Sequence, residues 1–126
     1  MNRAMWILGA ALLVSLVIIF FVIQFSSQHR PALNITTIGF EDVSVDFENI
    51  PSTVIQDGAI LYTNAGSSSC PPVIKEAAYT SEKTIELTIQ DYAGKQCTLD
   101  YSPIIQQIAR EDNVNITDDT TVLIAQ

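Results

Sequence analysis

The chain begins with a long apolar stretch and continues with a segment in which apolar and polar positions alternate. Residues Ala4 to Phe25 carry no formal charge, and at 1.5 Å of rise per residue they form about 33 Å of helix. This length predicts one uncleaved transmembrane signal anchor over residues 4–25. A cleaved signal peptide is the alternative, but its apolar core usually runs about 7–15 residues and ends in small residues. The stretch here is longer and ends in Phe25-Ser26-Ser27-Gln28-His29-Arg30.

Beyond the anchor, alternating apolar and polar residues predict strands, because a half-buried strand has a side-chain period of two. One strand is predicted over Phe40–Phe47. Its inward face comprises Val43, Val45 and Phe47, and its outward face comprises Ser44 and Asp46.

The plainest alternation predicts a hairpin over residues 84–101. The residues predicted to face inward are Ile85, Leu87 and Ile89 in the first strand, and Cys97, Leu99 and Tyr101 in the second. The segment Asp91–Lys95 between them contains Gly94, which readily takes the positive φ that hairpin loops of this length need.

Shorter apolar runs predict further strands. These runs are Ala59–Thr63, Val73–Tyr79 and Thr121–Ala125, with Leu33–Ile38 as a further candidate for pairing. Turn-forming residues separate them at Asn49–Ser52, Asp57–Gly58, Asn64–Gly66 and Asn113–Asp119. Short strands at this spacing predict an all-β domain, a small antiparallel β-sandwich or barrel, with an immunoglobulin-like arrangement among the options.

One segment has two interpretations. Ser102-Pro103 provides an N-cap residue and an N1 proline, and Ile104, Ile105 and Ile108 follow at helical spacing. We expect one or two helical turns here. An irregular edge strand beside the C-terminal strand is the alternative.

The two cysteines predict a disulfide. Cys70 opens a loop before Pro71-Pro72, and a bond to Cys97 would close a loop worth about 3–4 kcal/mol in the chain-entropy model. A domain of this size is otherwise marginally stable. A reactive thiol pair needs C-x-x-C spacing or basic neighbours, and neither is present near Cys70 in the sequence. A structural bond is therefore favoured over redox catalysis.

A disulfide also indicates the orientation of the chain in the membrane. Arg3 and the terminal amine on one flank of the anchor barely outweigh His29 and Arg30 on the other, so the positive-inside rule decides weakly. Disulfides form in oxidising compartments. We therefore expect residues 1–3 in the cytoplasm, a tether over residues 26–36 and an extracytoplasmic domain over residues 37–126 of a single-pass protein of the cell membrane.

Charge narrows the range of partners. From Pro31 onward the chain holds four basic residues and all 14 acidic ones, a net charge of −10. Such a surface repels nucleic-acid phosphates and anionic lipid headgroups. We expect no nucleic-acid partner, and a protein partner in the membrane or envelope.

The residue inventory argues against an enzyme. The only histidine is His29, beside the anchor, so a Ser-His-Asp system has no base in the domain. No set of His, Cys and Met suits zinc or copper, and glycine motifs that bind phosphate are absent. We expect no cofactor and no metal. Carboxylate pairs such as Asp46 with Glu48, and Asp118 with Asp119, have Ca²⁺ ligand chemistry but are common in any acidic domain.

Two sequons, Asn34-Ile35-Thr36 and Asn115-Ile116-Thr117, occur in the chain. One such triplet is expected by chance in a chain rich in Asn and Thr, and we treat both as coincidental.

A short pattern resembles one in small membrane-anchored or secreted actinobacterial proteins. In this chain it reads Gly66-Ser67-Ser68-Ser69-Cys70-Pro71-Pro72 and, later, Cys97-Thr98-Leu99-Asp100-Tyr101-Ser102-Pro103; there, G-S-S-S-C-P precedes C-T-x-D-x-x-P. The resemblance covers residues 66–103. It supports the disulfide and the N-terminal anchor, and because no activity is attached to those proteins it implies none.

The polar residues of this pattern form the candidate site: Ser67, Ser68, Ser69 and Asp100. Serine hydroxyls can bond their own backbone in a tight loop, and Asp100 can accept backbone donors from that loop. A structural role is favoured over a ligand site. The sequence thus predicts a membrane-tethered binding or structural module. The alternative is an accessory subunit of a larger membrane complex, with Ala11 and Ser15 as a weak helix-packing signal.

Overall fold

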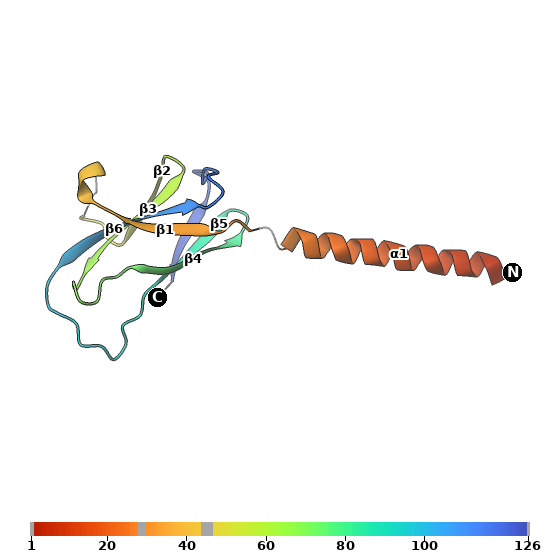
Figure 1. Ribbon diagram of the computed structural model, residues 1–126, viewed down its shortest axis with the longest axis horizontal. Coiled ribbons are helices and arrows are strands. Elements are labelled where there is room, and N and C mark those ends of the chain that lie inside the picture. Colours follow the sequence, from red (N-terminus) through yellow and green to blue (C-terminus); the bar gives the residue numbers. More distant parts are fainter. Residues whose placement is uncertain (1, 28–29, 44–46, 126) are drawn as a thin grey trace. The chain divides into compact units, whose positions relative to one another are not determined.

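The computed structural model describes residues 2–27, 30–43 and 47–125, and the chain divides into two compact units, Met1–Arg30 and Pro31–Gln126 (Figure 1). In chain order the elements are α1 (Asn2–Ser27), β1 (Leu33–Ile38), the 3-10 helix η1 (Phe40–Asp42), β2 (Ser52–Gln56), β3 (Ala59–Gly66), β4 (Ile74–Ser81), β5 (Thr84–Ile89), β6 (Ser102–Arg110) and β7 (Thr121–Ala125).

Helix α1 forms the first unit. Among the described residues it is the one helix long and apolar enough to cross a membrane, over Arg3–Ile23, and none of that span is buried by the chain itself. Apolar side chains on every face of a helix are typical of contact with lipid. Both membrane anchors and signal sequences have this character. Because α1 continues to Ser27 and β1 begins at Leu33, the tether predicted over residues 26–36 overlaps both elements.

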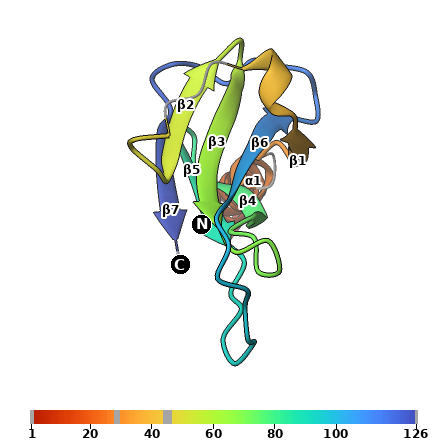
Figure 2. The same ribbon diagram turned by 90° about the vertical axis from the view of Figure 1, so that its left-hand side faces the viewer.

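The second unit is a β-sandwich, which confirms the predicted fold class. One sheet has the strand order β1-β6-β3-β2 and the other the order β4-β5-β7 (Figure 2). All pairs are antiparallel except β5 and β7, which run parallel. The sandwich is therefore not wholly antiparallel, because the chain crosses to the first sheet through β6 before β7 returns to β5.

The core lies between the two sheets and is aliphatic apart from one tyrosine. Its buried members are Ile60, Tyr62, Ile74, Ile85, Leu87, Ile108 and Ile116. Burying each such side chain contributes about 1.5–3 kcal/mol. One amide joins the sheets: the buried Gln106 of β6 accepts a 2.6 Å hydrogen bond from the backbone N–H of Ile74 in β4. This bond satisfies polar groups that would otherwise be costly to bury.

Five of the predicted strands are confirmed, as β1, β3, β4, β5 and β7. The turn at Asp57–Gly58 is also confirmed, with φ values of 52° and 77°, and it joins β2 to β3. The turn predicted at Asn64–Gly66 is wrong, because these residues continue β3 and pair with the start of β6.

The hairpin predicted over residues 84–101 is half right. Its first strand is β5, but β5 pairs with β4 and β7, and residues 90–101 form a connection without strands. Leu99 is fully exposed and Tyr101 is 68% exposed. The alternation in this segment therefore does not reflect a buried face.

The helix expected after Ser102 is a strand, β6. It lies between β1 and β3, so it is neither helical nor an edge strand beside β7. Ile105, Gln106 and Ile108 are all buried, so consecutive residues on both faces of the strand are covered. The alternation of a half-buried strand is therefore lost, and the isoleucines fall at helical spacing instead. Pro103 is tolerated because β6 pairs there with β3 alone, and pairing with β1 begins at Ile105.

The strand predicted over Phe40–Phe47 is contradicted at its start, where Phe40–Asp42 forms η1. Residues 44–46 lie outside the described residues. Phe40 and Phe47 contact each other, with ring centroids 5.9 Å apart. Their contact brings the two ends of the predicted strand together, which an extended strand cannot do. Strand β2 was missed because turn-forming residues flank its short apolar run on both sides.

The turn before β3 makes a testable prediction. Gly58→Ala should destabilise the domain by about 2–3 kcal/mol, because its φ is +77° and the new Cβ would lie 2.3 Å from Oδ1 and 2.7 Å from Cβ of Asn115. Gly94→Ala is the matched control, since φ is +79° but no atom lies within 4 Å; it should cost about 1 kcal/mol. Denaturant unfolding of the full chain in detergent measures both, and equal losses would contradict the steric account.

Candidate functional site

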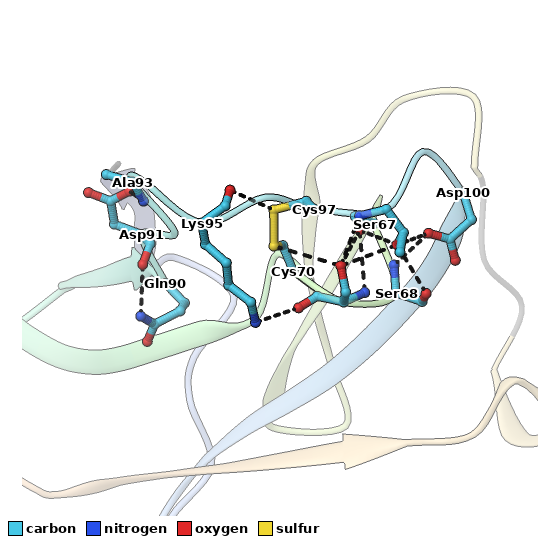
Figure 3. The surroundings of a disulfide bond; sticks show 11 residues. Ser67, Ser68, Cys70, Gln90, Asp91, Ala93, Lys95, Cys97 and Asp100 are labelled. Atoms are coloured by element: carbon cyan, nitrogen blue, oxygen red, sulfur yellow. Dashed lines mark hydrogen bonds between the residues drawn. A yellow bond between two sulfur atoms is a disulfide. The ribbon is translucent and has the colours of Figure 1, made fainter.

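The candidate site is built around the disulfide between Cys70 and Cys97 (Figure 3). Cys70 lies in the loop between β3 and β4 and is 8% exposed, whereas Cys97 lies half-buried in residues 90–101, hereafter the long connection. Their Cα atoms are 5.6 Å apart, within the usual range for such a bond. The predicted disulfide is confirmed. It joins two loops, and the strand expected around Cys97 is absent.

Beside the disulfide, four side chains form a hydroxyl cluster: Ser67, Ser68, Ser69 and Thr98. Ser67 Oγ lies 2.7 Å from Thr98 Oγ1 and 3.1 Å from Ser69 Oγ. The backbone N–H of Thr98 donates to Ser69 Oγ at 2.9 Å. The cluster therefore ties the long connection to the β3–β4 loop through side chains as well as through sulfur.

Asp100 completes this cluster. Its Oδ1 accepts the backbone N–H of Ser68 at 3.1 Å and the hydroxyl of Thr98. The candidate residues predicted from the sequence are thus brought together. Hydrogen bonds from the Ser68 side chain, then from Thr98 and the Ser68 backbone, lower the pKa of Asp100 from 3.8 to about 2.

Lys95 is a member of the site that the sequence analysis missed. Its Nζ donates to the carbonyl of Ser69 at 2.9 Å and lies 5.4 Å from the centroid of the Tyr92 ring. The fold thus places a basic residue beside the loop that holds Cys70, although none adjoins Cys70 in the sequence. The contact joins residues far apart in the sequence, and only the fold of the long connection brings them together. The preceding turn, with φ +79° at Gly94, follows the predicted turn chemistry.

The site is also connected to the core. The Tyr62 side chain is fully buried, and its hydroxyl donates to the carbonyl of Pro72 at 3.0 Å and accepts from Asn64 Nδ2 at 2.6 Å. Burial raises the pKa of Tyr62, against the opposing effect of the Asn64 hydrogen bond. Val73 N–H donates to the carbonyl of Pro71 at 2.7 Å. The double proline is thus held by backbone and side-chain donors, as a loop without N–H groups of its own requires.

The chemistry of this arrangement favours structure over reaction. The hydroxyls of the cluster bond to one another, and Asp100 accepts rather than donates. A carboxylate whose pKa is about 2 is a weak base toward a serine hydroxyl. His29 lies outside the described residues.

Other acidic residues give no metal site in the part of the chain that the structure describes, where no group of three or more His, Cys, Asp or Glu side chains is placed to hold an ion. Asp119 is engaged by Lys83 and by the Thr117 hydroxyl, which lower its pKa. Asp46, of the other carboxylate pair, lies outside the described residues. Asn34 and Asn115 are exposed.

Comparison with known proteins adds no relative: no family model, curated protein or solved structure matches the chain.

The disulfide makes a prediction that double-mutant analysis tests. Cys70→Ala and Cys97→Ala should each lower the free energy of unfolding by about 3–4 kcal/mol, and the double variant should lose little more, because either substitution already removes the cross-link. Denatured, unreduced protein should contain no free thiol. Losses that add in the double variant would show that the sulfurs act as separate packing groups.

Asp100 makes a prediction about pH. Its depressed folded-state pKa stabilises the domain above about pH 4, and this contribution is lost as pH falls through about 2. Asp100→Asn should therefore lower the melting temperature at pH 7, and the difference from the wild type should shrink between pH 4 and pH 2. Asp91→Asn, whose carboxylate accepts the Ala93 N–H in the same connection, is the control and should lower the melting temperature less. An unchanged melting temperature for Asp100→Asn would instead favour a ligand site.

Proposed function

We propose that the chain is a membrane-tethered extracytoplasmic module that binds or organises a protein partner and performs no catalysis. The observation that carries the proposal is a disulfide-bonded β-sandwich behind a 26-residue apolar helix. A structural disulfide needs an oxidising compartment. A helix with unburied apolar side chains along Arg3–Ile23 needs lipid.

The disulfide supports the orientation more strongly than charge does. Arg3 and Arg30 flank the apolar run almost evenly, so the positive-inside rule has little to act on. The cross-link joins loops at one end of the sandwich and stabilises a small domain that a reducing cytoplasm would weaken. With the domain outside, the N-terminus lies in the cytoplasm.

A binding or structural role is supported by the engagement of the site's polar groups and by the charge of the domain. The serine hydroxyls and Asp100 are engaged with each other, and the domain from Pro31 onward carries a net charge of −10. Such a surface favours basic protein partners over nucleic acid or anionic lipid.

The topology is tested by labelling intact cells with a membrane-impermeant, amine-reactive reagent. The reagent should modify Lys75 and Lys83, both exposed, and should miss the N-terminal amine until the cells are lysed. Mass analysis of the membrane-extracted protein should find Arg3 and Trp6 still attached.

Two outcomes would contradict this topology. A mature species beginning near residue 26 to 32 would show a cleaved signal peptide and a released domain. Lysine labelling only after lysis would place the domain in the cytoplasm.

A further inference from the structure

The two sides of the sandwich where the edge strands lie differ. On one side the edge strands β1 and β4 contact each other, so the two sheets meet there. The opposite edges are β2 and β7, both on the other side of the domain in Figure 2. An edge strand carries a row of backbone groups that can pair with another chain.

Edge β4 is protected in the ways common to natural sheets. Lys75 and Glu76 are exposed on it, and its pairing with β5 shifts register at two places. Charged side chains and irregular register both disfavour pairing with a further strand.

Edge β7 has none of these protections. Its sequence, Thr-Val-Leu-Ile-Ala, holds no charge and no proline, and its pairing with β5 is regular from Thr121 to Ala125. The N–H of Thr121 donates to Lys83 O at 2.7 Å. Because backbone groups alternate along a strand, the N–H and C=O groups of Val122 and Ile124 point away from β5. No described strand pairs with that side.

The surroundings of β7 are acidic. Glu86 of β5 lies opposite the exposed Leu123 in register, and no described cation pairs with it. Asp118 and Asp119 precede the strand, and the nearby ammonium of Lys83 is already paired with Asp119. A strand added beside β7 would therefore meet negative charge at its start and one strand away.

We propose that β7 binds an extended, lysine- or arginine-bearing segment of a partner protein as an added fourth strand of the β4-β5-β7 sheet. In this mode, main-chain hydrogen bonds to Val122 and Ile124 provide affinity. Basic side chains facing Glu86 and Asp118 provide selectivity. The inference rests on the proposed function as a binding module and names its partner. A second copy of the chain is disfavoured because each domain carries a net charge of −10.

The test measures binding of synthetic peptides to the full chain in detergent by fluorescence anisotropy. The probe is a fluorescein-labelled peptide of alternating Thr and Val with two Lys at each end. Two matched peptides carry Glu in place of Lys, or Pro in place of the central Thr. The lysine peptide should bind at least about tenfold more tightly than either, and high salt should weaken it.

Substitutions locate the binding edge. Val122→Pro removes an N–H that points away from β5 and so should leave the sheet paired while weakening binding at least about tenfold. Thr53→Pro, in the other edge strand β2, is the matched control. The two-residue turn after β2 makes Gln56 and Ala59 a hydrogen-bonded pair. Because backbone groups alternate along the strand, the N–H of Thr53 then points away from β3. This variant should leave binding unchanged.

Glu86→Gln provides a test without proline and should weaken binding of the lysine peptide several-fold with an unchanged melting temperature. Equal binding of the Lys and Glu peptides, unchanged binding to both Val122→Pro and Glu86→Gln, or loss only in Thr53→Pro would overturn the proposal. A dimer of the full chain that Val122→Pro dissociates would assign the edge to a second copy instead. Because the labelling experiment reports topology alone, either proposal can fail while the other stands.

Discussion

The bond between Cys70 and Cys97 is the constraint on which the candidate site depends. It crosses between two loops whose backbones share one hydrogen bond, from Gln90 N–H to Val73 O, so residues 97–100 have no backbone ladder that holds them against Ser67–Ser69. Once the disulfide holds the two loops together, the side chains of the hydroxyl cluster and Asp100 are close enough to form hydrogen bonds. Weak, exposed hydrogen bonds contribute little when they must also order a flexible chain. A cross-link that has already restricted the chain removes part of that cost.

The same loop is positioned from inside the sandwich. Tyr62 belongs to the core and reaches Pro72 with its hydroxyl, while the Gln106 amide spans the sheets to Ile74 at the start of β4. The first bond satisfies the carbonyl of Pro72 and the second satisfies the N–H of Ile74. Both backbone groups lie where the chain passes from one sheet to the other, and each needs a hydrogen-bond partner there. The site is therefore an extension of the core at one end of the sandwich.

Strand prediction from the sequence succeeded where one face of a strand is buried and the other is exposed to solvent. Strand β5 was predicted from alternation, β7 from a short apolar run and the disulfide from the two cysteines, all of which are local or compositional signals. It failed at β6, where the consecutive residues Ile105 and Gln106 are both buried and alternation is lost, and in the long connection, where alternation has no buried face behind it. Lys95 could not be found, because its contact with Ser69 depends on how the connection folds back.

Acidity and the open edge at β7 are related. An uncharged, regular edge strand normally promotes association between identical chains. A net charge of −10 on each domain opposes such pairing over about a Debye length, about 8 Å at physiological salt. The charge does not block the strand's hydrogen-bonding groups; it discriminates among the chains that approach them. A surface charge that first serves solubility can thus make an unprotected edge selective for strands of opposite charge.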